Sequence, residues 1–136
     1  MPHLVILYTA NLNFPTEEGG DMSGLCRALA DTMIAQRDET DKPVFPVGGV
    51  RVLAYPAAHF AVADGSGDFG FIYLQLRMGR GRSEWVQQRV GAALVASAKE
   101  CLAVLLTRQA VGVTLQIDVG AEVFDGKLGN LHPLFK

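Results

Sequence analysis

Pro2 is the residue of this sequence best suited to catalyse a proton transfer. It follows the initial methionine, and a small residue at this position normally permits removal of Met1. A free α-amino group has a pKa of roughly 8, and burial beside positive charges lowers that pKa further. The secondary amine can then act as a neutral base at physiological pH, where general acid/base catalysis is most effective. Many proteins begin with Met-Pro without any catalytic role, and retention of Met1 would leave the nitrogen in an amide.

Two arginines are the candidates for binding an acidic group. Arg82 lies in the run GRGRS, in which the glycines permit a tight turn after a strand and Ser83 can begin a helix. A cation at a helix N-terminus is unfavourable with respect to the helix dipole, so an anion bound there would stabilise the turn. Arg51 lies in an apolar stretch, where a charged side chain needs a partner or a route to water. A solvated turn for Arg82 and an exposed sheet edge for Arg51 remain the alternatives.

The other reactive residue types form no pattern of a metal site or a nucleophile. His3, His59 and His132 are scattered, and the two cysteines lack CxxC spacing. We expect Cys26 and Cys101 to be buried free thiols on the apolar sides of helices. GRGRS is too short to be a nucleotide-binding loop. The sequence therefore predicts no cofactor and no metal.

The hydrophobic pattern predicts the elements that position these residues. Strands are expected at residues 2–9, 49–55, 69–78 and 111–119, with one helix after Asp21 and a longer helix running from Ser83 past Leu105. The order strand, helix, strand thus occurs twice. We predict a single α+β domain over residues 1–136, in which two β-α-β units form a four-stranded sheet with two helices on one face. A ferredoxin-like domain has the same element order and remains open. Residues 38–46, which are polar and contain proline, are expected to form a mobile loop.

Composition limits the possible partners. The 136 residues carry a net charge of −2, with a pI near 5.9, so the chain lacks the basic character that attracts nucleic acid or an anionic membrane. Neither a signal sequence nor a membrane span is expected, and we expect a cytoplasmic protein. Only 19% of residues are charged, and two helices cannot cover every apolar strand face. These features predict a homotrimer.

Four segments carry a resemblance to a known family. They are the opening MPH, the run GGVR that ends at Arg51, GRGRS around Arg82 and the closing NLHPLFK. In this order and over nearly the whole chain, they resemble the 5-carboxymethyl-2-hydroxymuconate Δ-isomerase family of the tautomerase superfamily. The resemblance implies two β-α-β units, a symmetric trimer and an N-terminal proline, here Pro2, as acid/base catalyst. It also implies that Arg51 and Arg82 bind the carboxylates of the substrate.

The implied reaction converts a 2-hydroxy-2,4-dienoate into its conjugated 2-keto isomer during bacterial breakdown of homoprotocatechuate. The substrate would be 5-carboxymethyl-2-hydroxymuconate or a similar small anionic keto or enol acid. Residues 36–46 are longer and more charged than the resemblance leads us to expect, which bears on the choice of substrate.

Two other functions fit the same residues. Other members of the superfamily hydrate, dehalogenate or decarboxylate small carboxylic acids, but such reactions usually need a further polar residue to position water. A non-enzymatic, ferredoxin-like anion-binding domain would use GRGRS alone and leave Pro2 without a role. Reactivity of the N-terminal amine distinguishes this binding domain from the enzymes.

Overall fold

Two β-α-β units build the sheet of this protein. The computed structural model describes residues 2–12, 21–120 and 122–135. The first unit consists of β1 (His3–Thr9), α1 (Met22–Ile34) and β2 (Arg51–Ala57), and the second of β3 (Gly70–Gly79), α2 (Glu84–Cys101) and β4 (Val111–Gly120). Shorter helices are η1 (Ala10–Leu12), η3 (Val47–Gly49), α3 (Ala103–Arg108) and η4 (His132–Phe135).

The strand order decides between the two predicted topologies. The four strands lie in the order β2-β1-β3-β4, with β1 parallel to β2, β3 parallel to β4 and β1 antiparallel to β3. Each pair of parallel strands is therefore adjacent, whereas a split β-α-β unit has another strand between them. The ferredoxin-like alternative is wrong, and the predicted pair of β-α-β units in an α+β fold is confirmed.

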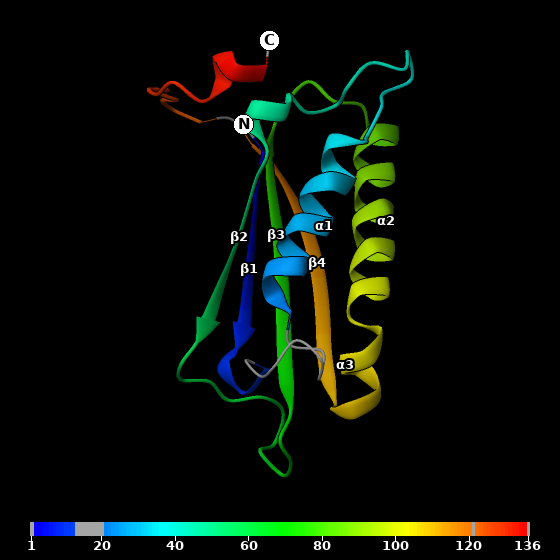
Figure 1. The fold of residues 1–136 in the computed structure, drawn as a ribbon, viewed down its shortest axis with the longest axis vertical. Helices are drawn as coiled ribbons and strands as arrows, with labels where there is room; N and C mark the ends of the chain where they lie inside the picture. Colours follow the sequence, from blue (N-terminus) through cyan, green and yellow to red (C-terminus); the bar gives the residue numbers. More distant parts are fainter. Residues whose placement is uncertain (1, 13–20, 121, 136) are drawn as a thin grey trace.

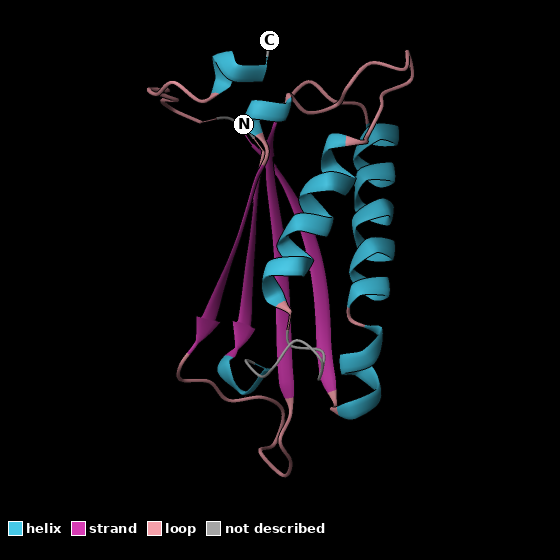
Figure 2. Cartoon of the chain, viewed as in Figure 1, coloured by secondary structure: helices cyan, strands magenta, loops and turns pink. Residues whose placement is uncertain are grey.

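Both long helices pack on the same face of the sheet, which gives a two-layer structure (Figures 1 and 2). Alternate side chains of the central strands point into this layer, because successive residues of a strand face opposite sides. The core between the layers includes Leu4, Ile6, Tyr8, Leu25, Leu29, Met33, Ile72, Leu74, Leu76, Met78, Val86, Val90 and Leu94. The predicted alternation in β3 and the central position of β1 are confirmed.

Capping residues fix the starts of the two helices as predicted. The Asp21 carboxylate accepts from the Gly24 N–H at 2.7 Å, and the Ser83 hydroxyl accepts from the Val86 N–H at 3.2 Å. The prediction of one continuous helix past Leu105 is wrong. The chain leaves the α-helical region at Leu102, and α3 continues separately to Arg108.

The predicted burial of both cysteines is also wrong. Both thiols are free, but Cys26 is only half-buried and Cys101 is exposed. The buried stripe at the end of α2 continues through Ala98, Leu102 and Leu105, so Cys101 falls beside it.

The sheet face opposite the helices remains open in the single chain. Leu7 is 46% exposed, Leu53 48% and Tyr55 51%, although all three are large apolar side chains. The predicted covered face of β4 is covered only in part, because Val113 and Val119 are each 39% exposed. A single chain therefore leaves much of its apolar strand surface in contact with water.

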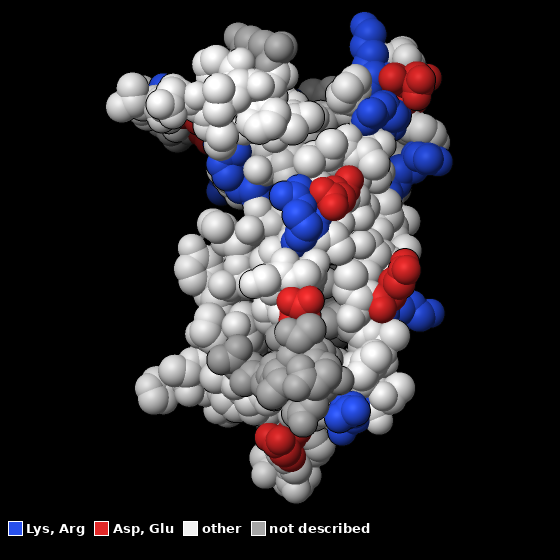
Figure 3. All heavy atoms as spheres, in the orientation of Figure 1, with Lys and Arg blue, Asp and Glu red and all other residues white. Residues whose placement is uncertain are grey.

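Charged side chains are sparse and scattered on the helix face, and most of that surface is uncharged (Figure 3). Arg27 and Asp31 form an exposed ion pair at 2.8 Å on the outer side of α1, as their predicted position indicates. None of the helices in the described part of the chain is long and apolar enough to cross a membrane.

Candidate active site

The three predicted site residues lie at one end of the sheet, where both termini are also found (Figure 1). Pro2 is buried and directly precedes β1. Its neighbour His3 pairs with Arg51 at the start of β2 and with Arg77 near the end of β3. Arg82 follows three residues after the end of β3. The topology thus brings together residues that are 80 positions apart in the sequence, counting from 2 to 82.

Arg51 is held by carbonyl groups of its own turn. Its Nη1 donates to the Gly48 carbonyl at 2.5 Å and to the Val50 carbonyl at 3.3 Å. The Nε–H and both hydrogens of Nη2 have no hydrogen-bond partner among the described residues. Because an Arg side chain offers five N–H donors, this edge of the guanidinium can hold a carboxylate through two parallel bonds.

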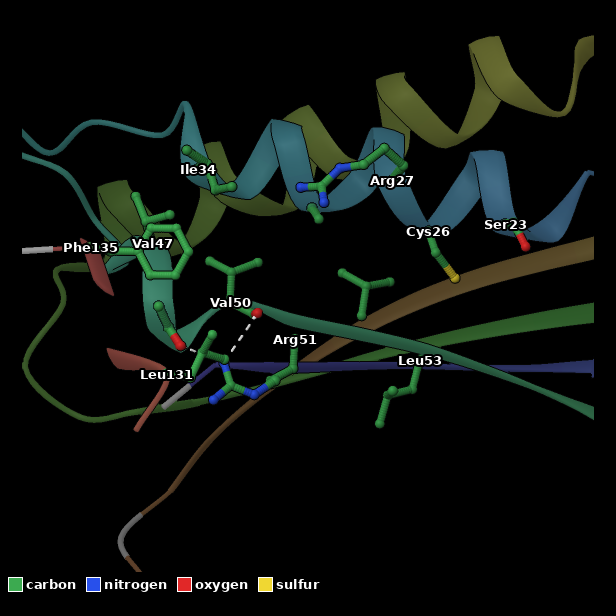
Figure 4. Close-up of a pocket in the computed structure, with 13 residues that line it drawn as sticks. Ser23, Cys26, Arg27, Ile34, Val47, Val50, Arg51, Leu53, Leu131 and Phe135 are labelled. Atoms are coloured by element: carbon green, nitrogen blue, oxygen red, sulfur yellow. Dashed lines mark hydrogen bonds between the residues drawn. The ribbon is translucent and has the colours of Figure 1, made fainter. Parts of the chain in front are cut away.

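Arg51 also lines two cavities at the start of β2. A cavity of about 680 Å³ lies between α1, β2 and η4 (Figure 4). A second one, of about 330 Å³, lies beneath residues 125–132 and is also lined by His3 and His132. Both volumes fall in or near the range of roughly 300 to 1,000 Å³ that is typical of small-molecule sites.

The C-terminal segment packs closely against the turn before β2 that contains Gly48. A Cβ atom on Gly48 would lie 3.0 Å from the His132 Cα and 3.1 Å from the His132 Nδ1, so only glycine fits without a shift. Leu131 and Phe135 complete the wall of the larger cavity (Figure 4). The sequence motifs GGVR and NLHPLFK therefore meet in space, although neither motif alone indicates this contact.

Arg82 is held by a segment distant in sequence. Its Nε and Nη2 donate to the Val44 carbonyl at 3.4 and 3.1 Å, and its Nη1 donates to the Gly79 carbonyl at 3.2 Å. The guanidinium carbon lies 5.0 Å from the centre of the Phe45 ring, a cation–π arrangement. Burial lowers the pKa of Arg82 from its ordinary value, and the group remains charged at physiological pH.

The turn that carries Arg82 has the predicted glycine conformation. Gly81 has φ = +110°, in a region that residues with a side chain rarely adopt. Arg80 in the same turn is exposed, as predicted, and Arg82 is half-buried. The cavity beside Arg82 is only about 110 Å³ and is also lined by Asp38 and Glu39, so it is too small to enclose a substrate.

His3 is affected by the positive charges around it. Burial lowers its pKa, and the charges of Arg51 and Arg77 lower it further. The imidazole is therefore neutral at physiological pH. It lies on the strand face shared with Arg51, while Pro2 is buried.

The described residues form no arrangement typical of a cofactor site. No group of three or more His, Cys, Asp or Glu residues with metal-binding geometry occurs in the described ranges. Residues 65–70, GSGDFG, have the spacing GxGxxG but lead into β3. Dinucleotide binding requires such a loop to open a helix.

Solved structures show the same fold with substantial sequence identity. A crystal structure of 5-carboxymethyl-2-hydroxymuconate delta-isomerase is 56% identical, with a TM-score of 0.94, and the match covers 100% of this chain and 93% of that one. A 5-carboxymethyl-2-hydroxymuconate isomerase from Deinococcus radiodurans R1 is 32% identical, with a TM-score of 0.83, over 99% of this chain and 94% of that one. Fold and likeness together place the chain among isomerases built on two β-α-β units.

The sequence comparisons identify the family. An Escherichia coli protein named 5-carboxymethyl-2-hydroxymuconate Delta-isomerase is 26% identical over 136 residues, which is 100% of each chain. Residues 2–135 match the model of the 5-carboxymethyl-2-hydroxymuconate isomerase family, and the chain belongs to this family.

Proposed function

We propose that this protein isomerises 5-carboxymethyl-2-hydroxymuconate or a closely similar 2-hydroxy-2,4-dienoate to the 2-keto isomer, with Pro2 as the acid/base catalyst. The observation that carries the proposal is the family match, which begins at residue 2 and reaches residue 135. The position of Pro2 beside the starts of β1 and β2 supports the assignment, since guanidinium and amine groups lie at the same end of the sheet.

The reaction needs one base and stabilisation of a developing negative charge. The Pro2 nitrogen accepts the proton of the 2-hydroxyl group, the C2–O bond becomes a carbonyl, and the double bonds shift along the chain. The protonated Pro2 then returns a proton to the far carbon of the dienol. Nearby positive charges favour the neutral form of the Pro2 amine before the reaction, which is the form that a base requires.

Arg51 and Arg82 are proposed to bind the carboxylates of the substrate. Each has N–H groups without a partner among the described residues, and no described carboxylate lies within ion-pair distance of either. Their charges are therefore available to an anion. A guanidinium close to the 2-oxygen would also stabilise the enolate that forms during proton transfer.

A homotrimer is proposed to complete the site. Within one chain Arg51 and Arg82 line different cavities, and the cavity at Arg82 is too small for the substrate. The open apolar strand face around Leu7, Leu53 and Tyr55 supports association, which would bring the sheet ends of neighbouring copies together. The free thiols fit a reducing compartment, so we also propose that the enzyme works in the cytoplasm.

The test is an assay of Met1-free protein with 5-carboxymethyl-2-hydroxymuconate and a panel of other 2-hydroxydienoates. General acid/base catalysis contributes about 10²- to 10⁴-fold to rate, so Pro2→Ala should lower kcat by that range while the protein remains folded. Wild-type kcat in Pro2→Ala would contradict the proposal. Activity toward none of the dienoates would refute the substrate class.

A further inference from the structure

Residues 36–44 form a hydrogen-bonded turn that leads to Phe45. One Asp38 carboxylate oxygen accepts from the Thr40 N–H and hydroxyl, both at 2.8 Å, and from the Lys42 N–H at 3.0 Å. The Asp38 N–H donates to the Lys42 carbonyl at 2.8 Å, and the Val44 N–H donates to the Gln36 carbonyl at 3.1 Å. These bonds close the segment on itself and give it a defined end at Val44.

This turn contacts the strand-to-helix turn of Arg82 at three points. The Ser83 hydroxyl donates to the Glu39 carboxylate at 2.6 Å. The Val44 carbonyl accepts from two nitrogens of Arg82, and the guanidinium carbon of Arg82 lies over the ring of Phe45, which follows the turn. Figure 1 shows both segments at the same end of the molecule, above the start of α2. The segment 36–45 therefore contacts the guanidinium group of Arg82 directly, in addition to the neighbouring Ser83.

Phe45 belongs to the hydrophobic core although it lies in a loop. It is 1% exposed, although it lies between two short irregular stretches and outside every helix and strand. A ring that is itself buried restricts where a guanidinium lying over it can move, and the two bonds to the Val44 carbonyl restrict its rotation. Together with the Gly79 carbonyl, these contacts leave one hydrogen on Nη1 and one on Nη2 without a partner among the described residues.

We propose that Phe45 is a positioning residue that holds the Arg82 guanidinium in the orientation in which it receives a substrate carboxylate. This inference rests on the proposed function, because it assumes that Arg82 binds substrate. It assigns a role to the segment 36–45: the segment supplies a buried ring and a carbonyl that orient the cation in advance, which reduces the entropy lost on binding. No carboxylate of the segment lies within ion-pair distance of Arg82, and Glu39 is bonded to Ser83.

The test compares Phe45→Leu, which keeps an apolar side chain but removes the aromatic face, with Phe45→Tyr, which keeps the ring. Loss of a cation–π contact of about 0.5 to 2 kcal/mol corresponds to roughly a 2- to 30-fold change. We expect Phe45→Leu to lower kcat/KM for the dienoate by this factor, mainly through a higher KM, and Phe45→Tyr to restore most of the loss. Leu94→Val, which alters a fully buried residue of α2, is the control for general loss of packing and should leave kcat/KM within about twofold.

A double-mutant cycle separates positioning from core packing. If Phe45 acts through Arg82, Phe45→Leu should have no further effect on kcat/KM in the Arg82→Ala background. Full additivity of the two changes would overturn the proposal, as would wild-type kcat/KM in Phe45→Leu when Arg82→Ala is impaired. Wild-type kinetics in Arg82→Ala would overturn the proposed role of Arg82 as well. Should Phe45→Leu fail to fold, Phe45→Met is the second variant, with the same expected loss and the same cycle.

Discussion

Arg51 and Arg82 lie at the same end of the sheet, but the chain holds them in different ways. Arg51 is bonded to the carbonyls of Gly48 and Val50, which are three residues and one residue away, respectively. Arg82 is bonded to the Val44 carbonyl, 38 residues away, and its guanidinium carbon lies over the Phe45 ring. The first arginine is thus oriented by its own turn, and the second by a separate segment of the fold.

The two arginines therefore differ in what their side chains do in the fold. Arg51 borders cavities large enough for a ligand, and its guanidinium keeps one whole edge without a described partner. Arg82 joins the segment 36–45 to the turn before α2, so its replacement affects both the charge at the site and the attachment of that segment. We therefore expect the two arginines to be similar in substrate binding and different in stability.

Among the changes that compare the two arginines, the largest expected effect is the loss of activity in Arg82→Ala. A charged hydrogen bond contributes roughly 1.5 to 3 kcal/mol, so kcat/KM should fall about ten- to a hundredfold or somewhat more. Arg82→Lys should lose nearly as much, because an ammonium cannot reproduce the paired bonds of Nε and Nη2 to the Val44 carbonyl. Steady-state kinetics of both variants test this, and full activity in Arg82→Lys would show that charge alone is sufficient.

Arg51→Ala should lower kcat/KM by about ten- to a hundredfold as well, through loss of the second carboxylate contact. If Arg51 only binds the substrate, KM should rise while kcat is retained, whereas a fall in kcat would assign it to the developing oxyanion. The exposed Arg80 is the matched control for net charge, and Arg80→Ala should change little. Equal losses at Arg80 and Arg82 would mean that the turn acts through nonspecific positive charge.

The free energy of unfolding should fall more in Arg82→Ala than in Arg51→Ala. Arg82→Ala removes bonds to two carbonyls and the contact with Phe45, so we expect a loss of about 1 to 2 kcal/mol in the free energy of unfolding. Arg51→Ala removes bonds only to its own turn and should lose less than about 1 kcal/mol. Urea unfolding at one fixed protein concentration measures both values, since an oligomer is stabilised by mass action. A larger loss of unfolding free energy in Arg51→Ala than in Arg82→Ala would contradict this expectation.

The smallest expected effect is on the titration of His3. Burial lowers its pKa, and the charges of Arg51 and Arg77 lower it further, so the folded protein disfavours the protonated imidazole. The contribution of His3 to stability is therefore fully present above about pH 6.5, the ordinary His value, and is lost as the pH falls from there through the lowered pKa. Arg51→Gln should raise the pKa of His3, and Arg82→Gln should not. Imidazole resonances followed by NMR would show the shift, and equal shifts in both variants would refute a local effect of Arg51.

Local patterns were sufficient to predict most of the fold. The alternation in β3 and the capping residues Asp21 and Ser83 are encoded within a few neighbouring positions, and all are found as expected. The end of α2 at Leu102 was not predictable in this way, because apolar spacing continues into α3. Strand β2 begins two residues later than expected, since residues 47–49 form the short helix η3.

Only those residues of the candidate site that lie in a recognisable sequence motif could be predicted. GRGRS and GGVR pointed to Arg82 and Arg51, but nothing near Phe45 in the sequence indicates that its ring meets a guanidinium 37 positions away. The contact of Gly48 with His132 is likewise a product of the tertiary fold. Hydrophobic periodicity and motif spacing cannot predict such contacts, because both describe only residues that are close together along the chain.

The central claim is that the amine of Pro2 is the base, and covalent labelling tests it most directly. Met1-free protein should react once per chain with a small electrophilic 2-keto acid, and mass spectrometry of the digested protein should place the adduct on Pro2. Labelling should be blocked by substrate, and protein that retains Met1 should be unlabelled and inactive. An adduct on Cys26 or on the exposed Cys101, or equal activity in the form that retains Met1, would contradict the account.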